Sequence, residues 1–201
     1  MHVEIVVEEP SAVVMLKQLM PLLLQEGDTW HPVPHRGKDE LLIELPRRLK
    51  RYANRMLYEP DLRVIILMDA DRDCRKVKIQ LEEIVAESGL FSKMTAPAGQ
   101  SFKVLTRLAV SELEAWFLGD RDAISAAFPR VHSNHFKGTY QDCDGLPDTW
   151  ETLHRILQKG GYYPSRYLKV EVAELIAAQL APARNESASF QYFCEGVATL
   201  R

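Results

Sequence analysis

The chain has 201 residues, of which 46% are hydrophobic and 26% are charged, and its formal net charge is −3. This length and composition are ordinary for a soluble globular protein and predict one sizeable α/β domain, or one domain with an appendage. The small negative charge excludes a global basic field that would draw the protein onto nucleic acid, so such binding would need local patches or a basic partner.

The cysteines and the N-terminus bear on the cellular compartment. Cys74, Cys143 and Cys194 are widely spaced and form no C-x-x-C motif, which argues against a disulfide framework or a zinc site. The first residues lack the basic and long apolar regions of a signal peptide. No apolar run reaches the roughly 20 residues of a membrane span. We therefore expect a cytoplasmic protein without a membrane segment.

The first predicted strand ends on an acidic residue. Residues 3–7 read Val-Glu-Ile-Val-Val, which indicates a strand, and a helix is expected from Pro10 to about Gln25, with Pro21 kinking it or ending it early. Glu8 then stands at the carboxyl end of a strand and just before a helix, where open α/β sheets place ligand-binding groups. The alternative is a solvated glutamate at a strand exit.

The next segment combines prolines, histidines and a basic helix. Residues 29–35 contain two prolines and predict an edge strand or a loop, with His31 and His35 at the surface. A helix is expected from Gly37 to about Met56, with Asp39 as its N-cap. Its outer face is either a solvated basic surface or a phosphate-contact surface, formed by Arg47, Arg48, Lys50, Arg51 and Arg55.

The central apolar run, Val64 to Met68, predicts a strand buried on both faces. It stops on Asp69, Asp71 and Asp73. In an extended chain, side chains at i and i+2 point the same way, so Asp69 and Asp71 can converge on one point. Converging carboxylates favour a hard divalent cation, Mg²⁺ or Mn²⁺. Asp73 is interpreted chiefly as the cap of the following helix and is kept as a further candidate ligand.

A later strand is also followed by acidic residues. Residues 103–109 predict a strand, and Ser111 with Glu114 matches the spacing of a capping box at a helix start. Glu112 and Glu114 could join the metal centre from this strand end; alternatively, one caps the helix and the other is exposed. The alternation of strands and helices predicts a mostly parallel sheet flanked by helices on both faces.

The C-terminal third reads differently. Residues 129–150 are irregular, and their His132 and His135 have a spacing too weak to indicate a metal site. Three helices are expected beyond them. We predict an α/β core at residues 1–128 and, at residues 129–201, a long loop and helical extension packed on that core.

A strand that ends in glutamate, followed by a later strand that ends in Asp-x-Asp, resembles the Toprim fold of topoisomerases, primases and overcoming-lysogenization-defect (OLD) type nucleases. The match is closer to one bacterial Toprim-like family, domain of unknown function 4276. The family pattern has an acidic N-terminal turn, a central hhhxDxD, an R-x-A-x-x-E-x-E-A-W segment, a Tyr/Lys stretch and a Ser-x-Ser-Phe end. The corresponding stretches here are Ile5–Glu8, Leu67–Asp71, Arg107–Asp120, Tyr167–Lys169 and Ser187–Phe190.

The resemblance implies a Toprim-like (Rossmann-like) fold and a Mg²⁺- or Mn²⁺-dependent nuclease or phosphodiester-processing activity on DNA or RNA. Glu8, Asp69 and Asp71 would hold the metal, with Glu112 or Glu114 as an outer ligand or acid/base. The nearest cations in sequence that could clamp a phosphate are Arg72, Lys76 and Lys103. Family members are often encoded beside AAA or ABC-type ATPases, which implies an ATPase partner and a role in anti-phage defence. A homo-oligomer is left open.

The chain departs from the family pattern after Glu8. Glu9 stands where the family has glycine, and Ala12 stands where it has a second glutamate. In an extended chain Glu9 would project to the side opposite Glu8. The missing acid and the negative net charge favour an alternative, a non-catalytic regulatory subunit of an ATPase complex. A phosphotransferase of the haloacid-dehalogenase type, with Asp69 as nucleophile, fits less well because that family expects Thr or Val at the position of Asp73.

Overall fold

The protein is built on a four-stranded parallel sheet with the strand order β2-β1-β3-β4. A computed structural model describes residues 1–70, 73–137 and 142–201. The strands are β1 (His2–Val7), β2 (Thr29–Pro34), β3 (Leu62–Asp69) and β4 (Val104–Ala109). This arrangement confirms the predicted α/β class with a parallel, Rossmann-like sheet, and it confirms β2 as an edge strand.

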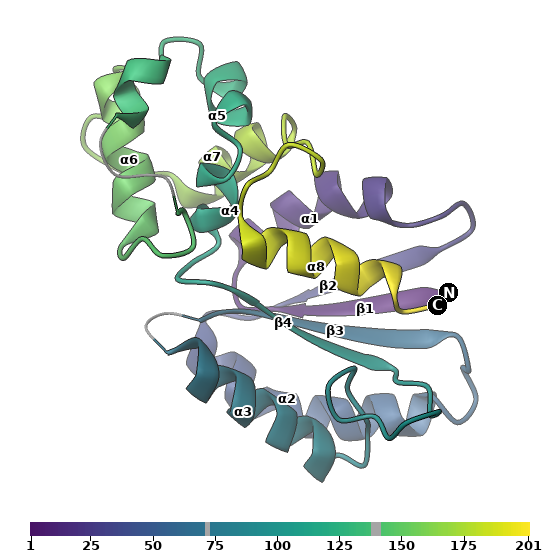
Figure 1. Cartoon of the computed structure of the whole chain (residues 1–201). Helices are drawn as coiled ribbons and strands as arrows, with labels where there is room; N and C mark the ends of the chain where they lie inside the picture. The colour runs from purple at the N-terminus through teal and green to yellow at the C-terminus, as the bar shows by residue number, and fades with distance from the viewer. Residues whose placement is uncertain (71–72, 138–141) are drawn as a thin grey trace.

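Helices cover both faces of the sheet (Figure 1). On one face lie α2 (Lys38–Arg55) and α3 (Cys74–Glu87), and on the other lie α1 (Pro10–Leu23) and α8 (Ala188–Ala198). Successive strand residues alternate between the two cores. The side chain of Ile65 joins the α1 and α8 side, whereas its neighbours in β3, Val64 and Ile66, join the α2 and α3 side. The central strands are therefore buried on both faces, as their unbroken apolar sequence predicts.

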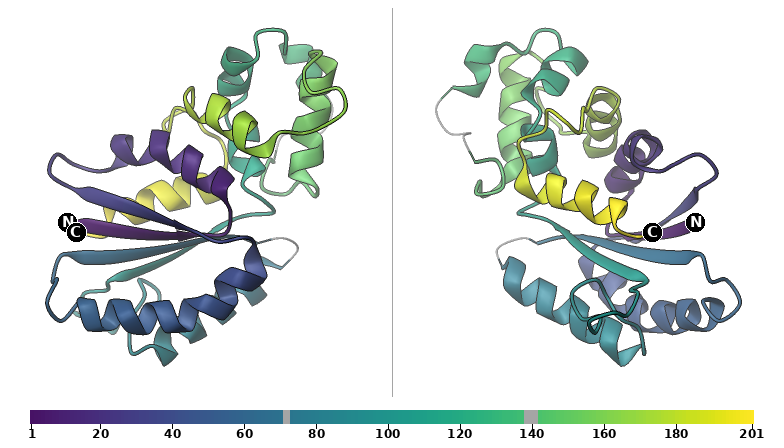
Figure 2. Two further views of the ribbon diagram at one scale, coloured as in Figure 1. Left: turned by 180° about the vertical axis from the view of Figure 1, so that it is seen from behind. Right: turned by 45° about the vertical axis from the view of Figure 1, so that its right-hand side comes forward.

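The remaining helices gather beyond the carboxyl ends of the strands (Figures 1 and 2). They are α4 (Glu114–Leu118), α5 (Arg121–Ala127), η1 (Ser133–Phe136, a 3-10 helix), α6 (Thr149–Lys159) and α7 (Lys169–Ala177). Their apolar side chains continue the same hydrophobic core as α1 and α8. Because α7 also packs along α1, the first residue of α7 is brought close to the turn after β1.

Two predicted helix caps are wrong. Helix α2 begins at Lys38 with Gly37 as its N-cap, not Asp39; Gly37 has a φ of 114°, a backbone conformation open to glycine. The capping box of Ser111 and Glu114 does not form. Ser111 has a φ of 64°, not the extended N-cap conformation, and its hydroxyl donates to the carbonyl of Leu146 at 2.8 Å.

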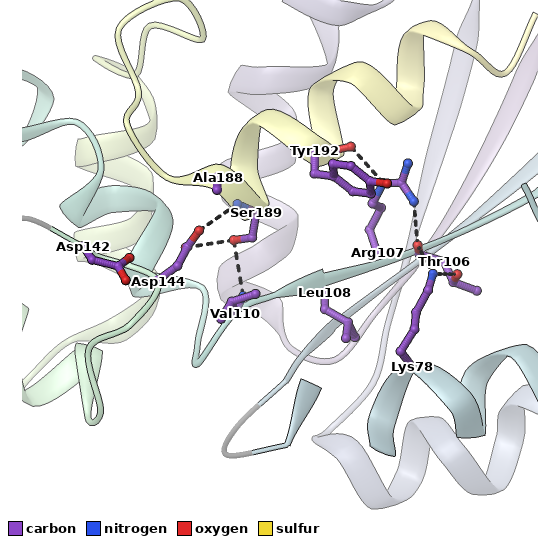
Figure 3. A pocket seen from close by; sticks show the side chains of 10 residues that line it. All are labelled: Lys78, Thr106, Arg107, Leu108, Val110, Asp142, Asp144, Ala188, Ser189 and Tyr192. Carbon is purple, nitrogen blue, oxygen red and sulfur yellow. Dashed lines mark hydrogen bonds between the residues drawn. The ribbon is translucent and has the colours of Figure 1, made fainter. Parts of the chain in front are cut away.

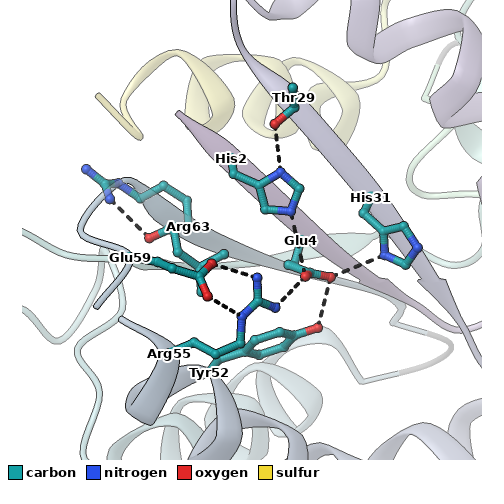
Figure 4. Close-up of polar contacts among 9 residues, drawn as sticks. His2, Glu4, Thr29, His31, Tyr52, Arg55, Glu59 and Arg63 are labelled. Carbon is teal, nitrogen blue, oxygen red and sulfur yellow. Dashed lines mark hydrogen bonds and ion pairs between the residues drawn. The ribbon is translucent and has the colours of Figure 1, made fainter. Parts of the chain in front are cut away.

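The basic face of α2 is partly used inside the fold. Arg55 donates to Glu4 at 2.6 Å and forms an ion pair with Glu59 at 2.8 Å (Figure 4). Lys50 and Arg51 are exposed. A phosphate-contact role for this face stays a prediction.

His35 is buried, so the prediction of a surface residue is wrong for it. Its Nδ1 lies 3.1 Å from the carbonyl oxygen of Val7, because the chain leaves β2 alongside the end of β1. His31 is exposed, as expected. Within the described ranges, no helix has the length and apolar character needed to cross a membrane.

Candidate metal centre

Three acidic side chains meet at the carboxyl edge of the sheet. Glu8 follows β1 directly, Glu9 precedes α1, and Asp69 is the last residue of β3. Each offers one carboxylate oxygen, and these oxygens all lie within 4.8 Å of one another. Val7 is in register with Leu67, so the two parallel strands end together and bring their following acids to one place. We call Glu8, Glu9 and Asp69 the acid cluster.

The presence of Glu9 corrects the expectation that it points away from Glu8. The alternation of side chains holds only inside a strand, and β1 ends at Val7. Glu9 is the N-cap residue of α1, where the chain turns into the helix at Pro10. The chain bends at Glu8 and Glu9, before the helix, and the Glu9 carboxylate lies beside that of Glu8.

The acid cluster is tied across the two strands by a backbone contact. The Asp69 N–H donates to Glu8 Oε2 at 3.2 Å. This hydrogen bond fixes the position of Glu8 against β3. Asp71, the second half of the predicted Asp-x-Asp pair, lies outside the described residues, and so does Arg72.

The electrostatics of the acid cluster are unfavourable for a carboxylate. Burial raises the pKa of Asp69 well above its usual range, and the nearby charges of Glu8 and Glu114 raise it further. Lys169 acts in the opposite direction and does not cancel the effect. Among the described residues, the site therefore has an excess of negative charge, which a bound cation would relieve.

Lys169 is a functional candidate to which the sequence assigned no role. Its Nζ lies 2.6 Å from Glu9 Oε1 and 4.0 Å from Glu114 Oε2. Burial alone would lower the pKa of Lys169, but the carboxylates of Glu114 and Glu9 raise it. The Tyr/Lys stretch of the family pattern was the only signal for this residue, because α7 is distant in sequence from both strands.

Glu114 lies beside the acid cluster in a buried position. Its side chain is only 1% exposed, and burial raises its pKa to about 7. The Tyr167 hydroxyl donates to Glu114 Oε1 at 3.2 Å. Oε2 is buried and has no hydrogen-bond partner among the residues that the structure describes. Glu114 thus has one fixed oxygen and one oxygen available for another group.

Two other predicted candidates cap helices. Glu112 Oε2 accepts hydrogen bonds from the Thr149 hydroxyl at 2.7 Å and from the Trp150 N–H at 3.0 Å, at the start of α6. Asp73 accepts from the Lys76 N–H at 2.9 Å and caps α3. The structure therefore does not bring Glu112 or Asp73 into the acid cluster.

One of the predicted phosphate-clamping cations, Lys103, is placed elsewhere. Lys103 precedes β4, at the end of the sheet away from the acid cluster, and its Nζ donates to the Pro60 carbonyl at 3.0 Å. Lys76 is exposed on α3. Proximity in sequence was misleading here, because a residue before a strand and a residue after it are separated by the full strand length.

A comparison with protein families decides the affiliation of the chain. The model described as "Domain of unknown function (DUF4276)" matches residues 7–198. The chain belongs to this family. The range shared with the DUF4276 family includes the acid cluster, Glu114, Tyr167 and Lys169. No curated protein and no solved structure matches the chain.

Proposed function

We propose that this DUF4276 protein is a Toprim-like nuclease, or a related phosphodiester-processing protein, that depends on Mg²⁺ or Mn²⁺. The observation that supports this most strongly is the convergence of Glu8, Glu9 and Asp69 within 4.8 Å at the carboxyl edge of the parallel sheet. Open α/β sheets bind their ligands at this edge.

The donor set fits a hard divalent cation. All three groups are carboxylates, and Mg²⁺ and Mn²⁺ prefer such oxygen ligands. The raised pKa of Asp69 reflects burial and like charges, both of which a cation would offset. The family pattern has its second glutamate in this turn, at the position that Ala12 occupies here. In this chain Glu9, from the same turn, supplies a third carboxylate.

The neighbouring residues would supply proton transfer and charge. When bound, Mg²⁺ would provide a Lewis acid that stabilises charge on the phosphate and lowers the pKa of an attacking water. Glu114, with a pKa near 7 and an available Oε2, can accept a proton at neutral pH. Tyr167 holds the other Glu114 oxygen in place. Lys169 positions Glu9 and adds a positive charge beside the site.

The proposed partner and biological role rest on the family resemblance alone. An AAA or ABC-type ATPase would deliver DNA or RNA to this edge of the sheet, as part of an anti-phage system. The exposed side chains of Lys50 and Arg51 on α2 are suited to contact the phosphates of a nucleic-acid backbone.

A second candidate function is a non-catalytic regulatory subunit of the same ATPase complex. It is favoured by Lys169, whose ammonium already lies 2.6 Å from Glu9 and neutralises part of the acid cluster without a metal. In that case the acids would serve the stability or the partner contacts of the chain, and no phosphodiester would be cut.

The test is a cleavage assay with supercoiled DNA and single-stranded RNA, in Mg²⁺ and in Mn²⁺, with and without a candidate AAA or ABC-type ATPase partner. We expect cleavage that Asp69→Asn reduces about 100-fold or more, as removal of a key electrostatic group does. Glu4→Gln, which changes an acid elsewhere on β1, is the matched control and should cleave normally. Intact nucleic acid in every condition, together with a stable ATPase complex, would favour the regulatory subunit.

A further inference from the structure

A groove of about 530 Å³ runs beside the free edge of β4, between α3 and α8 (Figure 3). Its volume lies within the range of about 300–1,000 Å³ that is usual for small-molecule sites. None of its lining residues belongs to the acid cluster. The groove is therefore separate from the candidate metal centre, and the proposed function leaves it unexplained.

One wall of the groove carries a buried cation, Arg107, that forms no ion pair with any residue the structure describes. Arg107 is only 6% exposed. Its Nε donates to the Tyr192 carbonyl and its Nη1 to the Thr106 carbonyl, both at 2.9 Å, and the guanidinium lies 4.7 Å from the centre of the Tyr192 ring. Within the described parts of the chain, no carboxylate forms an ion pair with it. Burial lowers the pKa of Arg107 although the charges of Glu82 and Glu195 act to raise it, so an external anion in direct contact would stabilise the guanidinium.

Lys78 adds a second cation at the same end of the groove. Its Nζ donates to the Thr106 carbonyl at 2.9 Å and forms an ion pair with Glu82 at 2.9 Å. The Thr106 carbonyl thus accepts hydrogen bonds from both Lys78 and Arg107, on the side of β4 that pairs with no other strand. Lys78 is therefore paired with Glu82, whereas no carboxylate of the described residues lies within ion-pair distance of Arg107, so Arg107 is the cation here that an external anion would meet.

The other end of the groove is negative. Asp144 accepts from the Ser189 N–H at 2.7 Å and from the Ser187 hydroxyl at 2.8 Å, and Asp142 accepts from the Gly145 N–H at 3.0 Å. Figure 3 shows both aspartates at the opposite end from Arg107 and Lys78. The lining between the two ends is mostly apolar, with Leu108, Val110 and Ala188.

We propose that this groove binds a small bipolar organic ligand. Its carboxylate or phosphate would meet Arg107 and Lys78, and its amine or amide N–H groups would meet Asp142 and Asp144. The apolar middle of the ligand would lie against Leu108. An amino-acid-like zwitterion and a nucleotide with an exocyclic amino group share this chemistry.

A simpler account is that Arg107 and Lys78 only protect the free edge of the sheet from pairing with other strands. The two accounts differ in what a blocked groove does. If the cations only protect the edge, the groove binds no small molecule, and filling the groove has no effect on ligand binding. If the groove is a ligand site, a bulky side chain placed in it removes binding while both cations remain.

The test is isothermal titration calorimetry of the full chain with two probes, adenosine monophosphate and the dipeptide alanyl-leucine. We expect at least one probe to bind with a Kd below about 1 mM. Ala188→Trp, at the exposed start of α8, should weaken binding at least about tenfold, whereas Ala198→Trp, at the other end of the same helix, should leave it unchanged. The probe that binds more tightly identifies the class of ligand.

Arg107→Met should also abolish binding, but Arg107 packs against Gly196 of α8 and its loss could unfold the chain, so Ala188→Trp is the decisive variant. Asp69→Asn should bind the probes like the parent protein, which separates this inference from the proposed nuclease. Absence of binding by both probes, or equal binding to Ala188→Trp, would overturn the proposal.

Discussion

Strand β1 carries two acidic sites that differ in what surrounds the carboxylate. Near its start, the carboxylate of Glu4 forms hydrogen bonds with the side chains of Arg55 at 2.6 Å, Tyr52 at 3.3 Å and His31 at 3.3 Å (Figure 4). We call these four residues the Glu4 cluster. Just past its end, Glu8 meets other carboxylates. Glu4 lies among several hydrogen-bond donors, whereas the described neighbours that act on Asp69 are three other carboxylates and Lys169.

The pKa values shift in opposite directions at the two sites. Burial would raise the pKa of Glu4, but hydrogen bonds from Arg55 and His31 lower it overall. Burial and like charges raise the pKa of Asp69. Hydrogen bonds within the protein thus favour the charged form of Glu4, whereas burial and neighbouring carboxylates disfavour the charged form of Asp69. We infer that the first serves the stability of the fold and the second serves ligand binding.

The comparison first predicts opposite changes in stability at the two sites. Glu4→Ala should lower the free energy of unfolding by about 2 kcal/mol, less than for a fully buried ion pair because Arg55 is 38% exposed. Asp69→Asn should raise it by about 1 kcal/mol in the absence of divalent cations, because repulsion is removed. Urea unfolding measures both. A loss of stability in Asp69→Asn would contradict the comparison.

A second prediction concerns pH. The pKa of Glu114 is raised from an ordinary 4.5 to about 7, so its contribution to stability is complete below pH 4.5 and is lost as the pH rises through about 7. Without divalent cations, stability should fall between pH 5 and 8 by an amount approaching about 3 kcal/mol from this group. Glu114→Gln should flatten the profile and the exposed Glu174→Gln should not. Equal slopes in the three proteins would refute this role for burial.

The Glu4 cluster should respond to pH with the opposite sign. Because the pKa of Glu4 is lowered, its contribution is present above its ordinary pKa of 4.5 and is lost as the pH falls through the folded value. Acid unfolding of Glu4→Gln should therefore begin from lower stability but show a shallower loss below pH 4.5. The comparison is supported if the Glu4 cluster controls the loss of stability at low pH and Glu114 controls the loss of stability as the pH rises.

Lys169 offers a test of competition within the acid cluster. Its ammonium lies where it neutralises Glu9, so Lys169→Met should raise the affinity for Mn²⁺ about tenfold, a change of about 1.4 kcal/mol. The exposed Lys159→Met is the matched control for the change in net charge. Weaker Mn²⁺ binding in Lys169→Met would mean that this lysine assists the metal site and does not compete with it.

The smallest expected effect is at Glu112. Because its carboxylate caps α6, Glu112→Ala should cost about 1 kcal/mol of stability, as the loss of a helix cap does. Nucleic-acid cleavage per folded molecule should stay unchanged. If Glu112→Ala lost cleavage but kept full stability, Glu112 would belong to the candidate metal centre. The distinction between acids that stabilise the fold and acids that bind a ligand would then not hold for Glu112.

The sequence was informative where local pattern and topology coincide. The unbroken apolar run at Val64–Met68 predicted a strand buried on both faces, and parallel strands brought Glu8 and Asp69 to one edge. The sequence failed where a turn or a distant packing contact decides the geometry. Glu9 joins the acid cluster where the chain bends at Glu8 and Glu9, and Lys169 lies there because α7 packs on α1. Neither is visible in the spacing of residues.

The central claim is that Glu8, Glu9 and Asp69 together hold one divalent cation. The most direct measurement is a Mn²⁺ titration followed by electron paramagnetic resonance, with the parent chain, Asp69→Asn and the control Glu4→Gln. Saturable binding that Asp69→Asn weakens at least about tenfold, and that Glu4→Gln preserves, is the predicted result. Equal Mn²⁺ binding by the parent chain and Asp69→Asn, or no saturable binding at all, would contradict the account.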